Sequence, residues 1–293
     1  MNLTDSSIIF WDASVTYLLV FNNPCIYHQT CDVSSAMSNN SFTESLLSSP
    51  DVAELYERAT RNQFLELAGK GRLPRETLSE WLAQDRLYCQ AYARFVGGLI
   101  SRVHLPKATD RPIAETLEWR ALTLLHNALA GIMAEMQLFE KTAGDYGLDL
   151  AAVGSGMESE AVGFGPYKTT QGYIDLFDSF AAQPGARTDK PLHEGLLVLW
   201  ATEVAYLHSW SYAKSQSPQN PDPSQDLDGG ALRKHLIDKW TSDQFRAFVK
   251  EIEECLEALI ARADDTEEVL LASSLSVLKK VLVLEEEFWP IVA

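Results

Sequence analysis

The sequence is poor in cysteine, and its few cysteines are scattered. Only 4 occur among 293 residues. They are Cys25, Cys31, Cys89 and Cys255, and no two of them form a C-x-x-C pair. A disulfide framework and a cysteine-bound zinc site are therefore not indicated. We expect the protein to work in a reducing compartment, the cytoplasm.

Positive charge and long apolar runs are also scarce. The chain has 24 Lys and Arg against 41 Asp and Glu, which gives a formal net charge of -17. Such a surface repels phosphate backbones and anionic lipids, so we expect neither nucleic acid nor a membrane as partner. A short apolar run at residues 17–21 cannot span a bilayer, and no basic segment precedes it, so a secretory signal is not expected either.

A convincing alternation of apolar and polar residues, which is typical of half-buried strands, is missing as well. From about residue 49 onward, apolar residues instead recur at helical spacing. The predicted helices cover residues 51–68, 73–103, 113–130, 132–146, 169–180, 192–213, 231–239, 242–263 and 266–289. This pattern predicts an all-α protein, a helical bundle.

Two regions fall outside the helical pattern. Residues 1–48 match no period, and we expect them to be a poorly ordered N-terminal extension of a helical domain over residues 49–293. Residues 215–230 contain three prolines and a pair of glycines. That composition is typical of a flexible insertion within the domain.

Three acidic residues each stand three positions before an aromatic residue. The pairs are Asp85 with Tyr88, Glu203 with Tyr206, and Glu285 with Phe288. On a helix this spacing places both side chains on one face, and Tyr92 extends the first stripe by another turn. A buried acid requires a hydrogen bond or a counter-charge. Flat rings beside it suit a small aromatic ligand that carries amino groups.

Several short motifs follow one another in a fixed order. They are GRLP at 71–74, WLAQDRLY at 81–88, TQGY at 170–173, WTSDQF at 240–245 and LEEEFW at 284–289. In this order they resemble the motifs of the TenA family, which includes thiaminase II and aminopyrimidine aminohydrolases. The resemblance covers the chain from about residue 50 to its end. It implies a heme-oxygenase-like helical bundle that assembles as a homo-oligomer, a dimer or a tetramer.

The same resemblance implies roles for the acids and for the aromatic residues. It implies that Asp85 anchors the pyrimidine, and that Glu203 and Glu285 share the proton transfers of a hydrolysis, one protonated and the other ionised. The aromatic residues expected around the substrate are Tyr88, Tyr92, Tyr173, Tyr206, Trp240 and Phe288. Glu135 aligns with a further acid of the family, but Phe139 replaces the histidine that often follows it, so its role stays open.

One position departs from the family pattern. Many members carry a nucleophilic cysteine in an L-P-C-x-x-x-Y helix, and the matching stretch here is WATEVAY at 200–206. Thr202 takes the cysteine position. The neighbouring Glu203 resembles the cysteine-lacking branch of plants and fungi. The expected function is therefore direct hydrolysis of aminopyrimidine or formylaminopyrimidine fragments in thiamin salvage.

Other interpretations remain open at this point. Asp85 could form a salt bridge with Arg86, residues 285–287 could be one solvated face, and any one of the aromatic residues could simply pack in the core. A repurposed, non-catalytic pyrimidine-binding protein is a second hypothesis. A metal-dependent oxygenase is a third, but the six histidines form no E-x-x-H pair. We therefore expect a site without metal or cofactor.

Overall fold

The computed structural model describes residues 41–153, 163–181, 190–219 and 222–292. Internal contacts divide the chain into two units, Met1–Asn39 and Asn40–Ala293. Most of the expected N-terminal extension, up to residue 40, lies outside the described residues. Within the described part, every regular element is a helix, which confirms the all-α prediction.

The second unit contains all the helices that the structure describes. They are α1 Phe42–Leu47, α2 Pro50–Thr60, α3 Gln63–Gly69, α4 Arg75–Ile100, α5 Leu117–Tyr146, α6 Lys168–Asp178, α7 Leu192–Ser215, α8 Ile237–Trp240, α9 Asp243–Ile260 and α10 Glu267–Phe288. Two 3-10 turns, η1 Ile113–Glu115 and η2 Pro223–Gln225, and a π-helical turn, η3 Leu232–Leu236, complete the described elements.

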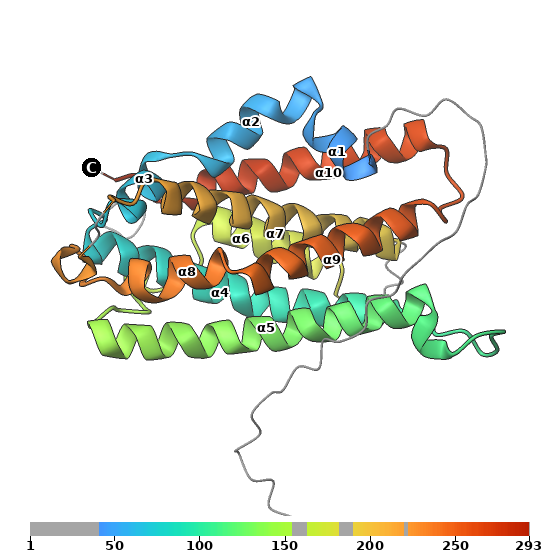
Figure 1. Ribbon diagram of the computed structural model, residues 1–293, viewed down its shortest axis with the longest axis horizontal. Coiled ribbons are helices and arrows are strands. Elements are labelled where there is room, and N and C mark those ends of the chain that lie inside the picture. The colour runs from blue at the N-terminus through green and yellow to red at the C-terminus, as the bar shows by residue number, and fades with distance from the viewer. Residues whose placement is uncertain (1–40, 154–162, 182–189, 220–221, 293) are drawn as a thin grey trace, which may run out of the picture. The chain divides into compact units, whose positions relative to one another are not determined.

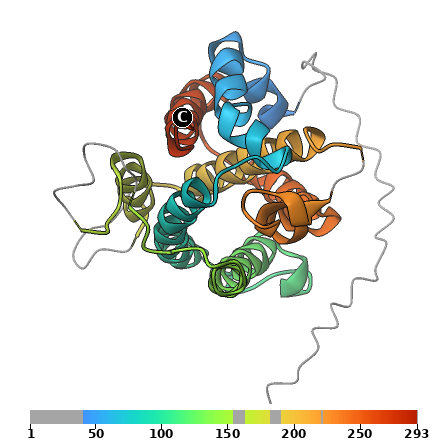
Figure 2. The ribbon, with the colours of Figure 1, turned by 90° about the vertical axis from the view of Figure 1, so that its left-hand side faces the viewer.

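Helix α7 is the central element of the bundle. It packs against α2, α3, α9 and α10 (Figure 1). Seen along the bundle, α2 and α10 lie on one side of α7 and α5 on the other (Figure 2). Residues 195–202 are all buried, which is expected of a helix that is apolar on every side. The middle of α7 therefore holds Glu203 and Tyr206 against neighbouring helices.

Two predicted helix boundaries are wrong. The helix expected over residues 51–68 is two helices, because the side chain of Asn62 accepts a hydrogen bond from the backbone of Leu65 at 3.1 Å and starts α3. The break expected at Gly131 does not occur. Gly131 is exposed and has open space around its α-carbon, so α5 continues to Gly147, whose φ of 65° ends it.

Part of the expected flexible insertion is attached to the bundle. Asp226 and Asp228 are buried, Arg233 forms an ion pair with Asp226, and Asp228 accepts hydrogen bonds from two backbone N–H groups that follow it. The backbone N–H of Leu227 donates to Gly71 at 3.1 Å. Gly71 has a φ of 67°, and a β-carbon there would lie 2.2 Å from Asp226, so this turn requires glycine. The flexibility of the segment stays a prediction.

A cluster of aromatic rings closes the bundle where α3, α4, α7, α8 and α10 meet. Trp81 stacks on Trp289 at 5.8 Å, and Trp210 contacts Trp240 at 4.5 Å between ring centroids. Phe64 packs against the first pair. We call these five residues the tryptophan cluster. Burial of such large rings contributes strongly to stability and fixes the helices around the acidic residues described below.

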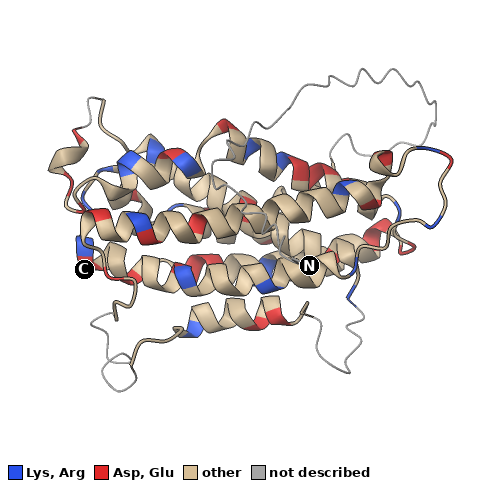
Figure 3. Cartoon of the chain, turned by 90° about the horizontal axis from the view of Figure 1, so that it is seen from below, with Lys and Arg blue, Asp and Glu red and all other residues tan. Residues whose placement is uncertain are grey.

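The outer faces of the helices carry both signs of charge, interspersed along their length (Figure 3). Many exposed ion pairs join residues four apart on one helix, such as Arg58 with Glu54. Pairs of this kind contribute little to stability. Among the described residues, no helix has the length and apolar character required to cross a bilayer.

Candidate active site

The three predicted acidic residues lie on three different helices, and their side chains face the interior of the bundle. Asp85 on α4 and Glu285 on α10 are 3% and 5% exposed, and Glu203 on α7 is partly buried. Burial raises the pKa of Asp85 well above its usual range, and the charges of Glu135, Glu285 and Glu203 add to this effect. Ligand atoms of Asp85 and Glu135 lie within 4.8 Å of one another, and Glu203 and Glu285 are near enough for their charges to act on Asp85, so the four carboxyl groups form one cluster.

Each acidic residue accepts a hydrogen bond from an aromatic residue of another element. Tyr206 donates to Asp85 at 3.4 Å, Tyr92 to Glu203 at 2.5 Å, Tyr173 to Glu285, and Trp240 through Nε1 to Glu135 at 3.1 Å. The spacing of three residues had suggested partners on the same helix. The hydrogen bonds instead join α4 with α7, α6 with α10, and α5 with α8, because aromatic donors reach across the interior. We call the four acids and these four aromatic residues the acid cluster.

The environments of two acids bring their titration close to neutral pH. Burial raises the pKa of Glu203 to about 8, although the hydrogen bond from Tyr92 lowers it. Burial raises the pKa of Glu285 to about 7, against a hydrogen bond from Tyr173. Both carboxyl groups therefore titrate well above the usual range of a glutamate, and Glu203 does so at the higher pH. A pair of carboxyl groups in different protonation states can act as acid and base in one reaction.

Glu135 and Cys89 also lie in this space. Ligand atoms of Asp85, Cys89 and Glu135 lie within 4.8 Å of one another, and Cys89 is buried. Cys89 follows Asp85 by four residues, a spacing that could have revealed it in the sequence. Two carboxylates and a thiol are a donor set that can hold a metal such as zinc. Burial and the neighbouring acids raise the pKa of the Cys89 thiol, so it is protonated when no ion is bound.

Little positive charge balances the four acids. The contact between Glu135 and Lys239 at 3.6 Å is the one salt bridge that the described residues give them. The Asp85–Arg86 bridge considered above does not form. Arg86 instead places its guanidinium 5.6 Å from the centroid of the Phe164 ring. The cluster is therefore suited to a ligand that brings protons or positive charge.

Aromatic rings surround the acids. The Tyr88 ring meets Tyr173 edge to face at 5.0 Å between centroids and lies 6.0 Å from Phe288. Tyr88, Tyr206 and Phe288 are partly exposed, whereas Tyr92, Tyr173 and Trp240 are buried. All six predicted aromatic residues thus lie close to the acids. Trp240 also packs in the tryptophan cluster, so core packing is part of its role.

Thr202 occupies the position at which the family pattern has its cysteine. It is buried, and its hydroxyl bonds to the backbone carbonyls of Val198 and Leu199 at 3.2 and 3.0 Å. A hydroxyl held by its own helix has no base to activate it as a nucleophile. The carboxyl groups, and not the Thr202 hydroxyl, are therefore the candidates for chemistry at this site.

Local contacts explain why α4 and α10 aim their acids inward. Gln84 accepts hydrogen bonds from Tyr167 at 2.9 Å and Thr170 at 2.7 Å, which fixes α4 against the start of α6. On α10, Glu286 bonds to Arg58 at 2.7 Å, so the neighbouring Glu285 faces the interior. Residues 285–287 are therefore not one solvated face.

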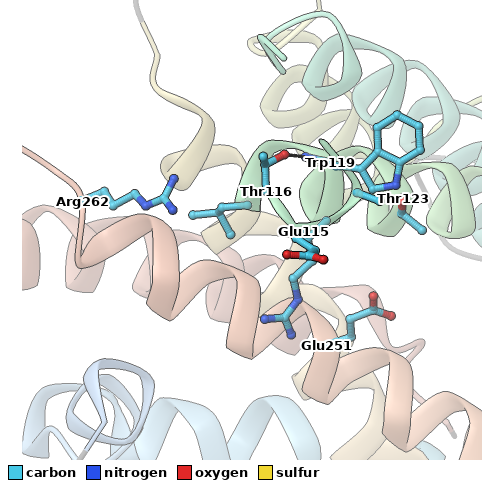
Figure 4. Close-up of a pocket in the computed structure, with 9 residues that line it drawn as sticks. Glu115, Thr116, Trp119, Thr123, Glu251 and Arg262 are labelled. Carbon is cyan, nitrogen blue, oxygen red and sulfur yellow. Dashed lines mark hydrogen bonds between the residues drawn. The ribbon is translucent and has the colours of Figure 1, made fainter. Parts of the chain in front are cut away.

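Two surface hollows lie outside the acid cluster. One, of about 480 Å³, lies between η1, α5 and α9, and its lining includes Trp119, Thr123, Glu251 and Arg262 (Figure 4). The other, of about 600 Å³, lies between α2 and α7. None of the four converging acids lines either hollow. In the first hollow Arg262 is engaged with Glu118 at 3.1 Å.

Comparison with known proteins identifies the family to which the chain belongs. A family model described as TENA/THI-4/PQQC matches residues 49–293. A probable transcription factor of Fusarium pseudograminearum is 28% identical over 254 residues, covering 77% of this chain and 47% of that protein. The chain thus spans about half the length of this relative. A probable bifunctional TENA-E protein of Glycine max is 22% identical over 235 residues, covering 80% of this chain and 86% of that protein.

Solved structures agree with the fold. A TenA homologue from Pyrococcus furiosus superimposes with a TM-score of 0.62 at 22% identity, covering 85% of this chain and 98% of that one. A putative TenA-like thiaminase from Sulfolobus solfataricus gives a TM-score of 0.53 at 14% identity, with 87% and 95% covered. The family match spans most of the sequence and includes all four converging acids. The chain belongs to the TENA/THI-4/PQQC family.

Proposed function

We propose that this protein hydrolyses a C–N bond of aminopyrimidine or formylaminopyrimidine fragments in thiamin metabolism, without a cysteine nucleophile, metal or cofactor. The observation that carries the proposal is the convergence of Asp85, Glu203 and Glu285 among aromatic donors, with two of the acids titrating near pH 7. The names of the soybean and Sulfolobus relatives, TENA-E and TenA-like thiaminase, support the same class of substrate.

Asp85 is the proposed anchor for the ring. A carboxyl group can pair with a ring nitrogen and the adjacent exocyclic amine of an aminopyrimidine through two parallel hydrogen bonds. Protonation of the ring nitrogen would add a positive charge where Lys239 is the one ion-pair partner that the described residues supply. The rings of Tyr88 and Phe288, which keep part of their surface exposed, would then cover the faces of the pyrimidine.

Glu203 and Glu285 divide the proton transfers in this proposal. The ionised Glu285 accepts a proton from water as the water oxygen bonds to the carbon that carries the leaving nitrogen. The C–N bond breaks with its electron pair on nitrogen, and Glu203 protonates the departing amine. The higher pKa of Glu203 suits the donor and the lower pKa of Glu285 suits the base.

The test uses the full chain and a panel of aminopyrimidine and formylaminopyrimidine fragments, with release of ammonia or formate as readout. We expect turnover by the wild type and a loss of about 100-fold or more in Glu285→Gln, the range of a general acid or base. Glu287→Gln is the matched control, because Glu287 is exposed two residues away. Equal inactivity of all three proteins across the panel would refute the proposal.

A second candidate is a pyrimidine-binding protein that performs no reaction. The hydroxyl of Thr202, engaged by backbone carbonyls where the family pattern has its nucleophile, favours it, as does the name of the Fusarium relative. Calorimetry separates the two, since binding of the same pyrimidines without turnover supports this candidate. Assembly as a homo-oligomer in the cytoplasm stays a prediction in both cases, and light scattering would determine the number of subunits.

A further inference from the structure

The hollow between α2 and α7 places a histidine and a tyrosine in direct contact. Its volume is about 600 Å³, and its lining residues are Ala53, Tyr56, Glu57, Thr60, Arg61, His208, Ser211, Tyr212 and Ser215. The hydroxyl of Tyr56 lies 2.7 Å from Nδ1 of His208, and the two rings meet edge to face at 5.9 Å. Tyr56 is partly buried and His208 is exposed. The pair therefore joins the interior to a solvent-filled space.

The register between α2 and α10 places Tyr56 at the level of Glu285. Two contacts set this register, Asp51 with Lys279 at 2.8 Å and Arg58 with Glu286 at 2.7 Å, and each joins residues 228 apart. The same offset places Tyr56 level with the turn of α10 that carries Glu285. Nε1 of Trp289 also donates to the carbonyl of Ala59 at 2.9 Å, which holds the ends of the two helices together.

The electrostatics agree with this placement. Burial raises the pKa of Tyr56, and the charge of Glu285 raises it further, so the phenol keeps its proton. The pKa of His208 is lowered by partial burial and by the positive charges of Arg246 and Arg61. At neutral pH the imidazole is therefore neutral, with one nitrogen able to accept a hydrogen bond and the other able to release a proton.

We propose that Tyr56 and His208 form a proton relay that connects Glu285 with solvent in the hollow between α2 and α7. This inference rests on the proposed function, in which Glu285 takes a proton from water in every turnover. A fully enclosed carboxyl must pass that proton on before it can act again. The two relay residues act through Glu285 and need not touch the substrate.

The transfer balances with one proton moved. Protonated Glu285 gives its proton through a bridging water to the Tyr56 oxygen, Tyr56 gives its hydroxyl proton to Nδ1 of His208, and Nε2 of His208 releases a proton to water. Glu285 ends ionised, Tyr56 ends as a neutral phenol, and His208 ends as the other neutral tautomer. Exchange with water then restores the first tautomer. Glu203, left ionised by the reaction, takes a proton from the water that replaces the product, so each turnover neither gains nor loses a proton.

Charged and titratable groups face both ends of the relay. Around His208 they are Tyr56 from α2, Arg61 after α2 and Arg246 from α9, with Glu57 lining the same hollow. Around Glu285 they are Tyr173 from α6, Tyr56 from α2, and Asp85 and Glu203 from α4 and α7. Positive groups at the outer end favour release of the proton to water. The negative groups around Glu285 favour binding of the next proton there.

The test measures turnover of the proposed pyrimidine substrate by the full chain in dilute buffer. We expect His208→Ala to lower kcat about tenfold without a matching change in KM, because proton transfer then limits the rate. Free imidazole fits the vacated hollow and should restore the rate, which a purely structural loss would not allow. Tyr56→Phe should lower kcat similarly, but free imidazole should not restore the rate. The missing hydroxyl lies between Glu285 and His208, where imidazole in the hollow does not replace it.

The controls come from the same surfaces. Tyr212→Phe removes a hydroxyl from the same hollow, and His126→Ala removes an exposed histidine of α5, so both should keep the wild-type rate. Wild-type kcat in His208→Ala at every buffer concentration would overturn the relay. So would a loss that imidazole does not restore.

A second readout does not depend on turnover. The pKa of His208 would be followed by NMR in the wild type, in Glu285→Gln, in Tyr56→Phe and in the double variant. We expect Glu285→Gln to lower the pKa of His208, and to do so less when Tyr56 is phenylalanine. An inactive wild type would refute the proposed function. The NMR titration would still test the relay in that case, because it does not require turnover. If the pKa of His208 is the same in the wild type and in Glu285→Gln, the relay is overturned.

Discussion

The acid cluster and the tryptophan cluster are both buried, both rich in aromatic rings, and joined at Trp240. They differ in what their polar atoms meet. In the acid cluster each carboxyl group accepts a hydrogen bond from an aromatic donor. In the tryptophan cluster the Nε1 group of Trp81 is buried without a hydrogen-bond partner among the described residues. The acid cluster brings the pKa values of Glu203 and Glu285 close to neutral pH. The tryptophan cluster stabilises the fold through the packing of its rings.

The largest effect should come from the tryptophan cluster. Trp81 is fully buried and contacts Phe64, Trp210, Trp240 and Trp289, so Trp81→Ala leaves a large cavity. We expect a loss of about 3–5 kcal/mol in the free energy of unfolding, measured with urea. Trp119→Ala, at an exposed tryptophan of α5, is the control. A comparable loss in the control would mean that burial does not set the difference.

A substitution in the acid cluster should lower the rate of the proposed reaction without lowering the stability of the fold. Glu203→Gln removes a proton donor, so we expect kcat for the proposed reaction to fall about 100-fold, or about 2.7 kcal/mol in activation free energy. The free energy of unfolding should not fall, because glutamine removes a buried group that resists ionisation. Kinetics and urea unfolding on the same samples test both halves. Parallel losses of rate and stability would erase the contrast between the two clusters.

The pH dependence of stability should separate the clusters again. The folded-state pKa values of Glu203 and Glu285, about 8 and about 7, lie above those of an unfolded chain. The unfolded state therefore releases protons first, and stability falls as pH rises from about 4.5 toward 8, by up to about 1.4 kcal/mol per pH unit for each group. Urea unfolding between pH 5 and about pH 8 measures the slope.

Removal of one acid supplies the check on that slope. Glu203→Gln should reduce the fall in stability with pH, and Trp81→Ala should leave it unchanged while lowering the whole curve. A slope that is identical in the wild type and in Glu203→Gln would show that the carboxyl group is ionised in the folded protein at neutral pH. Glu203 could then not be the proton donor, and the assignment of Glu203 as acid and Glu285 as base would be wrong.

The sequence predicted most of the fold, and it failed where a single residue decides between ending and continuing a helix. The helix predicted over residues 242–263 begins one residue later, at Asp243, because the Ser242 hydroxyl caps it by accepting a hydrogen bond from the backbone N–H of Phe245. Asn62 performs the same role within an apolar stripe, so its signal was hidden. Gly131 has helix-breaking character, but the packing of α5 on α4 and α9 overrides that preference.

Three of the four acids of the acid cluster were predictable, but their aromatic partners were not. Spacing and the family resemblance selected Asp85, Glu203 and Glu285, which the structure brings together. Which aromatic donor reaches which acid depends on how the helices are rotated against one another, and that follows from packing over the whole bundle. Glu135 lies on a helix with many exposed polar positions, so nothing local marked it as facing inward.

The smallest effect should come from Cys89, the thiol that lies beside two acids of the cluster. Burial and its acidic neighbours hold the pKa of this thiol well above its usual value, so it is neutral and a poor nucleophile at pH 7. We expect Cys89→Ala to change kcat less than about twofold and to cost about 1 kcal/mol of stability through the lost packing. Kinetics with the pyrimidine panel and urea unfolding measure the two quantities. A loss of rate as large as that of Glu203→Gln would mean that a thiol from α4 has replaced the missing cysteine of α7, and that the reaction proceeds through a covalent intermediate.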